Sequence, residues 1–441
     1  MNVSFKAGLI FSMLAGLQTS ALSQGISLEE VIREVSTKSD SVKILQETVI
    51  KSKMQIKEQW ANALPTVLSK LAGASNLIAI NPANGQPLPN IKPSPLYNAS
   101  IDISQPLYTF GKVGTAIKVA NFYDSSNQLS YKRGIEQLQL LGLDAFYRVI
   151  LAEMSLVITE RSLERKKELN EFLTRNFKLG KGSKAQILST SADLESLFPE
   201  IIKARQGARS AKMQLCVLMG RPMSDSIQLD TSSSLQSVLS EPLPSREVAV
   251  KAAFENRSDL HSIDFLKKAN DGGAKIFKAM YLPSIAGTFS FGVNGDKPGD
   301  IADWAQRNWR AGIGVQWMMF DGFANSAKAS QYQSDSRKLE IKKNSFAKII
   351  EIEIENALTD CIVADSNLPA SRIVFAAAQE AYDLTAENFK QGDGQFADLQ
   401  LAEERLRQVE MGIMTARYMQ MRSRAALLVA MGKTIIPTEG K

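Results

Sequence analysis

Few side chains in this sequence are suited to catalysis or metal binding. The 441 residues include one histidine, His261, and two cysteines, Cys216 and Cys361. Zinc and iron sites draw on several such residues at short, regular spacings, and none of those spacings occurs. A Ser-His-Asp triad would have to use His261, which has no nucleophile elbow near it. We therefore expect no catalytic residue and no metal site, and we expect His261 to be a surface or half-buried side chain.

Nucleotide and nucleic-acid binding are also disfavoured. Neither G-x-G-x-x-G nor G-x-x-x-x-G-K-[ST] occurs in the chain. A net charge of +6 would suit a nucleic-acid binder, but the 52 basic and 46 acidic residues are interspersed without a basic block. The sequence predicts a protein that is not an enzyme, binds no nucleic acid and needs no cofactor.

Residues 1–23 are typical of a secretory signal peptide. Lys6 precedes an apolar run at residues 7–17, and ALS at residues 21–23 is a small-x-small cleavage pattern. The apolar run is too short to span a bilayer, and no later stretch reaches 18 apolar residues. We expect cleavage after Ser23 and export of the mature chain.

One short sequence is written twice. NFKLGKG begins at Asn176 and returns as NFKQGDG at Asn388, an offset of 212 residues. VLMG at 217–220 returns as VAMG at 429–432 with the same offset. Such landmarks in one order predict a tandem duplication, with structural repeats at residues 24–230 and 231–441. The two cysteines lie 145 residues apart and do not follow the offset, so each is expected to be a buried small side chain.

Each repeat contains two segments in which apolar and polar residues alternate. Strand pairs are expected at about 64–75 and 96–108, and at about 282–293 and 309–320. Alternation over about ten residues suits a transmembrane β-strand, although a half-buried sheet in a soluble domain gives the same pattern. The signal peptide and the aromatic residues near the strand ends favour a membrane location.

Four strands in one chain are too few to close a barrel. A transmembrane barrel needs about eight strands, and open strand edges are not tolerated in lipid. If these strands cross a membrane, several chains must share one barrel. Three chains would give about twelve strands, three times four.

Long helices are expected in both repeats. Residues 112–177 contain nothing that breaks a helix except scattered glycines, which predicts a helix about 100 Å long. Pro369 is expected to kink or interrupt the corresponding helix of the second repeat. Shorter helices are expected at 28–63 and 245–280.

Glycine pairs mark the turns between the long helices. Gly180 with Gly182, and Gly392 with Gly394, are expected to supply the positive φ of a tight reversal. Two such turns predict two helical hairpins, with tips at about 178–184 and 390–396. Both tips are expected at the end of the molecule far from the strands.

With these features the chain resembles the TolC-like outer-membrane efflux protein family. SLEEVIREVSTKSDSVK, ALPT followed by SQPLYTFGK, and NFKLGKGSKAQIL followed by LCVLMGRP carry the resemblance, each with a second-half counterpart. The resemblance implies a mixed α and β fold: a trimeric channel with a 12-stranded transmembrane β-barrel, four strands per chain, continued by a long α-helical barrel. It also implies that residues 221–243 form an equatorial linker beside the C-terminal tail.

The resemblance further implies partners and a location. The expected assembly is a homotrimer in outer-membrane lipid that extends into the periplasm. A periplasmic adaptor (membrane fusion) protein would dock on the hairpin tips, and an inner-membrane pump would be engaged indirectly. The adaptor-contacting residues would be Gly180, Lys181, Gly182, Gly392, Asp393 and Gly394. For Lys181 and Lys184, plain solvation is an equally good interpretation.

A periplasmic gate is implied at the second tip. Asp398 lies six residues after Gly392, where the family carries an acid, and three such acids around an axis would bind cations and select by charge. Leu401 and Gly394 replace a second acid and a basic residue of the family pattern, so Asp393 is expected to substitute in part. The alternative for Asp398 is a first-turn charge stabilised by the helix dipole by about 0.3–1 kcal/mol.

The expected function is that of an outer-membrane exit duct in a tripartite efflux system. It would passively conduct substrates from the adaptor and pump to the exterior. Two alternatives stay open: an exit duct for type I protein secretion, and a non-conducting periplasmic structural protein made of helical hairpins.

Overall fold

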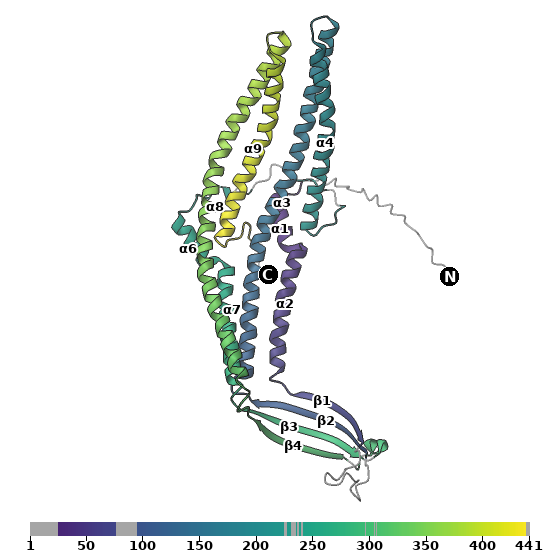
Figure 1. Cartoon of the computed structure of the whole chain (residues 1–441), viewed down its shortest axis with the longest axis vertical. Helices are drawn as coiled ribbons and strands as arrows, with labels where there is room; N and C mark the ends of the chain where they lie inside the picture. Colours follow the sequence, from purple (N-terminus) through teal and green to yellow (C-terminus); the bar gives the residue numbers. More distant parts are fainter. Residues whose placement is uncertain are drawn as a thin grey trace, which may run out of the picture.

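In the computed structural model the chain is a long, narrow molecule, helical over most of its length with a sheet at one end (Figure 1). The structure describes residues 25–75, 95–224, 227–230, 235, 238–239, 241–295, 297–303, 305 and 307–437. The predicted signal peptide and its cleavage point lie outside these residues. In the part of the chain described, none of the helices has the length and apolar character needed to cross a membrane.

The same succession of elements occurs twice. The elements are α1 (Leu28–Lys38), α2 (Asp40–Ala61), β1 (Thr66–Ser75), β2 (Pro95–Tyr108), α3 (Lys112–Lys178), α4 (Lys184–Leu218), α6 (Arg246–Asn256), α7 (Ser258–Ala279), β3 (Ser284–Gly295), the 3-10 helix η1 (Pro298–Ala302), β4 (Arg307–Gln316), α8 (Ala324–Gln391) and α9 (Phe396–Ala430). Helices at corresponding places match in length: 11 residues in α1 and α6, 22 in α2 and α7, 67 and 68 in α3 and α8, and 35 in α4 and α9. These lengths support a tandem duplication, while the boundary between residues 230 and 231 stays a prediction.

The four strands form one antiparallel sheet in the order β1-β2-β3-β4. The β2–β3 pair joins the two repeats, and Ile101 faces Phe291 across it. Among the described residues, β1 and β4 each have a strand partner on one side only. β4 is exposed along its whole length, with Trp309, Ile313 and Val315 exposed by 70%, 74% and 66%. The chain alone therefore leaves apolar side chains and two sheet edges uncovered.

The observed strands lie close to the segments that alternation predicted. The largest difference is at β4, which ends at Gln316 although the predicted strand runs to residue 320. Gln316 already faces Ser284, the first residue of β3, so no strand partner remains beyond it. Trp317 instead donates its indole N–H to the carbonyl oxygen of Tyr281 at 2.9 Å, where the chain turns toward α8.

The long helices form two antiparallel hairpins, α3 with α4 and α8 with α9. Their tips lie at the end of the molecule opposite the sheet (Figure 1). α3 begins and ends within one residue of the prediction. α3 contacts both α7 and α9, so it joins the first repeat to the second.

The shorter helices are each interrupted once, so the predicted continuous helices at 28–63 and 245–280 are wrong. Ser39 has extended backbone between α1 and α2, and its hydroxyl accepts a hydrogen bond from the Val42 N–H. Arg257 has extended backbone at the corresponding place between α6 and α7.

A glycine packs against each interruption. Gly220 and Gly432, with φ of +74° and +73°, end the two hairpins. A Cβ on Gly220 would lie 2.6 Å from the carbonyl oxygen of Lys38, and one on Gly432 would lie 2.8 Å from the amide nitrogen of Arg257. At each break, therefore, the backbone between the two short helices lies directly against the backbone at the end of the hairpin in the same repeat.

α8 runs through Pro369 as one helix, so the predicted interruption is wrong. Proline removes the hydrogen bond to the carbonyl four residues earlier, at Asp365. The Asp365 side chain is held by α9, because it accepts a hydrogen bond from Gln420 at 2.9 Å and pairs with Arg424 at 2.6 Å. Packing against the second helix of the hairpin thus maintains α8 at the residue where backbone bonding is lost.

The largest buried cluster lies midway along the molecule, where α1 and α3 meet the linker and the C-terminal tail. Buried Gln139 accepts a hydrogen bond from the Ile435 N–H at 2.6 Å and donates one to the Ile436 carbonyl oxygen at 3.0 Å. Cys216 belongs to this cluster and Cys361 to a second one around α6 and α8. Both cysteine side chains are buried, as the sequence predicted, and they form no disulfide with each other.

A group of charged side chains around the buried Arg133 and Arg257 also connects the repeats at this level. Arg133 of α3 pairs with Asp259 of α7 at 3.2 Å, and Asp259 pairs with Arg257 at 2.8 Å. Arg257 in turn binds Glu353 of α8. Burial alone would raise the pKa of Asp259, but hydrogen bonds and charge from Arg257, and charge from Arg133, hold it below its usual value. Asp259 therefore stabilises the fold above about pH 4, and that contribution is lost as the pH falls through the lower pKa of the folded state.

Replacing Gly220 tests the close approach at the first break. Gly220→Ala places a side chain at positive φ and against the Lys38 carbonyl, so it should cost about 1–3 kcal/mol and lower the thermal midpoint measured by circular dichroism. The matched control is Gly207→Ala, since nothing lies within 4 Å of a Cβ at that exposed site inside α4. The control should leave stability unchanged or raise it by up to about 1 kcal/mol. Equal midpoints for the two variants would contradict the packing described.

Candidate functional site at the helical tips

The two tips have the same backbone arrangement. In the first, the Asn176 carbonyl oxygen accepts the N–H of Lys181 at 2.9 Å. In the second, the Asn388 carbonyl oxygen accepts the N–H groups of Asp393 at 3.0 Å and Gly394 at 3.1 Å. In each tip the carbonyl oxygen of the repeated asparagine thus accepts hydrogen bonds from N–H groups of the turn, and these bonds end the long helix.

The two glycines of each tip are required for different structural reasons. Gly180 and Gly392 have φ of +73° and +95°, as predicted. Gly182 and Gly394 do not have positive φ, so the prediction is wrong for them. A Cβ at Gly182 would lie 3.0 Å from the Phe177 nitrogen, and one at Gly394 would lie 2.8 Å from the Phe389 nitrogen. The second glycine is therefore required for close backbone approach to the end of the long helix.

The predicted gate and docking residues are at the surface of the second and first tips. Asp398 lies exposed in the first turn of α9, and Asp393 is exposed in the turn itself. Lys181 and Lys184 are exposed at the first tip. Within the described chain no ion pair involves any of these four side chains, so their roles as gate or docking residues stay predictions.

Sequence reasoning missed a cluster of charged residues behind the tips, where α9 crosses α3. Glu403 of α9 is only 6% exposed. Its carboxylate accepts a hydrogen bond from the Ser162 hydroxyl at 2.6 Å and pairs with Arg165 at 3.3 Å and Lys166 at 3.7 Å, all on α3. These contacts join the second hairpin to the first.

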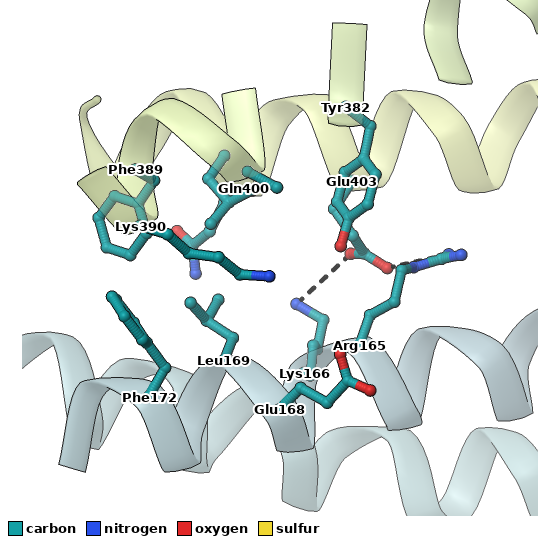
Figure 2. A pocket seen from close by; sticks show the side chains of 12 residues that line it. Arg165, Lys166, Glu168, Leu169, Phe172, Tyr382, Phe389, Lys390, Gln400 and Glu403 are labelled. Carbon is teal, nitrogen blue, oxygen red and sulfur yellow. Dashed lines mark hydrogen bonds and ion pairs between the residues drawn. The ribbon is translucent and has the colours of Figure 1, made fainter. Parts of the chain in front are cut away.

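A second set of contacts adds α4 to this junction. Lys166 pairs with Asp193 of α4 at 3.2 Å, and Asp193 also accepts a hydrogen bond from Gln400 of α9 at 3.0 Å. Figure 2 shows Lys166 of α3 and Glu403 of α9 reaching toward one another between the helices. One signal was present in the sequence: Glu403 and Glu410 are seven residues apart and so share a helix face. Their partners are distant in the chain, and no spacing rule identifies them.

Other chemistry-bearing side chains lie away from the tips. His261 is half-buried in α7, with Nε2 3.0 Å from the Glu255 carbonyl oxygen, which matches the sequence expectation. In the described chain no cluster of three or more histidine, cysteine, aspartate or glutamate side chains is arranged to hold a metal ion.

Two comparisons with known proteins found matches to this chain, one with a family model and one with solved structures. Residues 249–433 match the family model described as outer membrane efflux protein. No match was found among curated protein sequences.

Solved outer-membrane channels share the fold over more than nine-tenths of this chain. VceC from Vibrio cholerae is 14% identical with a TM-score of 0.74, over 93% of this chain and 97% of that one. The Campylobacter jejuni CmeC channel is 13% identical with a TM-score of 0.77, over 92% and 85%. The open state of the Neisseria gonorrhoeae MtrE channel is 18% identical with a TM-score of 0.72, over 93% and 90%.

These findings confirm the predicted fold class, with four antiparallel strands and long helices arranged as in the TolC-like channels. They also confirm the resemblance to outer-membrane efflux proteins. The second half of the chain thus matches the outer membrane efflux protein model, and nearly the whole chain has the fold of solved outer-membrane channels.

Neutralising Glu403 tests how the hairpins are joined. Glu403→Gln removes a nearly buried charge that pairs with Arg165 and Lys166, at an expected cost on the order of 3 kcal/mol. Amide hydrogen exchange at the α8–α9 tip should accelerate. Glu404→Gln is the control, because Glu404 is only half-buried and pairs with Arg407 on its own helix. Unchanged exchange in Glu403→Gln would show that other contacts join the hairpins.

Proposed function

We propose that three copies of this chain form one outer-membrane exit duct of a tripartite efflux system. The duct conducts substrates passively from a periplasmic adaptor and an inner-membrane pump to the exterior. The observation that carries this proposal is the four-stranded sheet with two open edges, β1 and β4, attached to helices that match the efflux channel fold. A second copy of the sheet pairs with each edge, and three copies close a barrel of about twelve strands.

An apolar row along α8 supports the same assembly. Ile341, Ile352, Val363 and Val374 recur every eleven residues and are exposed by 69%, 61%, 51% and 41%. Eleven residues are close to three helical turns, so the four side chains follow one face of the helix. A row of this length exposed to water favours burial against a partner helix.

The duplication indicates which surface meets this row. Inside the chain, α3 of the first repeat contacts α7 and α9 of the second. By length and order α3 corresponds to α8, α7 to α2, and α9 to α4. We therefore assign α2 and α4 of a neighbouring copy as the surface that covers α8. Ile44 of α2 and Ile202 of α4 are available there, exposed by 68% and 61%.

The periplasmic gate is assigned to the second tip. Asp398 and Asp393 are exposed acids at the end of the molecule opposite the sheet. Three copies around an axis bring three such pairs together, which attracts cations and resists anions. The tip residues 180–182 and 392–394 offer the adaptor two similar turns per chain and six per trimer, three times two.

Single-channel conductance tests the duct and its gate together. In a planar bilayer the wild-type trimer should give small, flickering current steps, and Asp398→Ala should widen them because a ring of charge is removed. The control is Asp383→Ala, an exposed acid on α8 away from the tip turn. Equal steps in wild type and Asp398→Ala would remove the gate from the second tip. A verified trimer that conducts in neither form would favour the structural, non-conducting alternative.

A charge in the α8 row tests the assembly surface. Ile352→Glu should abolish the trimer in detergent, because an ionised carboxylate cannot be buried unpaired between helices. The matched control is Val248→Glu on α6, whose side chain is 59% exposed and lies outside the row. The measurement is sedimentation of the extracted protein. A stable Ile352→Glu trimer would contradict the assignment of this face.

A further inference from the structure

The two edge strands of the sheet, β1 and β4, correspond by the duplication to β3 and β2, the two strands that pair at its centre. β1 and β3 begin 218 residues apart, and β2 and β4 begin 212 residues apart. The strand pairs confirm both offsets. Thr66 faces Ser104 in the β1–β2 pair, and Ser284 faces Gln316, at the corresponding positions, in the β3–β4 pair. The two repeats therefore have the same strand register.

The central pair then indicates how β4 would meet β1 of a second copy. Ile103 of β2 faces Phe289 of β3. The corresponding residues are Val315 of β4 and Leu71 of β1, so these two should face each other where two copies join. A slip by one residue is excluded, because it would turn the apolar face of one strand to the polar face of the other.

The same register gives strand partners to residues beyond Gln316, where β4 ends in the single chain. β2 continues to Tyr108, which faces Ile285 after a shift in register. Phe320 is the residue that corresponds to Tyr108, and Val67 corresponds to Ile285. In the assembly Phe320 should therefore lie opposite Val67 of the next copy.

The exposed apolar side chains of the two edges match in this register. β1 has three large apolar side chains, and all three are exposed: Val67, Leu68 and Leu71. The residues that would face them on the next copy are also apolar and exposed: Phe320, Met318 and Val315. A slip of two residues would lose this match, because Val315 would then face a serine or a glycine, at position 69 or 73.

We propose that β4 pairs antiparallel with β1 of the next copy in this register, and that β4 extends to Phe320 in the assembly. The inference rests on the proposed duct of three chains and adds which residues meet where two chains join. The backbone groups of residues 317–320 have no strand partner within the described chain. The extension pairs them, as an apolar environment requires.

Disulfide cross-linking in outer membranes tests the register. Leu71→Cys is combined with a second cysteine at one of three exposed positions: Val315→Cys, Ile313→Cys or Trp317→Cys. Directly opposite residues have Cα atoms about 4.5–5.5 Å apart, within disulfide range, whereas a displacement of two residues gives about 7–8 Å. Leu71 with Val315 should therefore give at least ~10-fold more cross-linked chains on a non-reducing gel than either other pair.

A cross-link of this kind can form only between copies. Within one chain β1 and β4 are the two edges of a four-stranded sheet, about 14 Å apart over three strand spacings. Leu71→Cys alone is the background control, since the native Cys216 and Cys361 are buried. Native mass spectrometry of each variant under reducing conditions shows whether the trimer has formed.

A further pair tests the extension of β4. Leu68→Cys with Met318→Cys should cross-link as well as Leu71 with Val315, and at least ~10-fold better than Leu68→Cys with Gln316→Cys. Trimers that cross-link best through Ile313 or Trp317, or through no pair, would overturn the register and leave the duct standing. Cross-linking at Val315 without any at Met318 would overturn the extension. A wild-type particle of one folded chain would overturn both the duct and the register.

Discussion

The two open edges of the four-stranded sheet are the constraint on which the rest of the structure depends. Backbone N–H and C=O groups at such edges have no water to bond with inside a membrane, and each unpaired group costs several kcal/mol. β4 combines an open edge with exposed Trp309 and Ile313, so it requires both a strand partner and an apolar environment. In the proposed assembly, further copies of the same chain supply the strand partner, and lipid supplies the apolar environment.

The duplication gives the molecule two similar faces with different chemistry. The contact between repeats inside the chain is rich in charge, with Arg133 pairing with Asp259 and Glu403 pairing with Arg165. The corresponding face on α8 is apolar. Ser162 of α3 donates a hydrogen bond to Glu403, and the residue at the matching place in α8, 212 positions later, is the exposed Val374. Charged contacts are specific in geometry, so they suit pairing within one chain, whereas an apolar row suits assembly between chains.

Local patterns predicted the elements well, because strand alternation and an unbroken helical stretch are properties of neighbouring residues. This is why α3 and the four strands lie close to their expected bounds. The failures depend on distant contacts. The interruptions at Ser39 and Arg257 follow from the close approach of Gly220 and Gly432. The unbroken helix at Pro369 is held by α9.

At the candidate site, too, features set by neighbouring residues were predictable and features set by distant contacts were not. The turn glycines were identifiable, since a repeated Gly-x-Gly between helical stretches is a local signal. The sequence did not show why residue 394 must be a glycine, because the Phe389 backbone lies against it only in the folded turn. The junction at Glu403 depends on α3 residues more than 230 positions away in the chain, and a single sequence does not pair them.

The most direct test of the account is the mass of the particle extracted from outer membranes in mild detergent, measured by native mass spectrometry. The account predicts a particle of three identical chains, because that number closes the sheet edges and covers the α8 row. A stable particle of a single folded chain, with its strands intact, would contradict it.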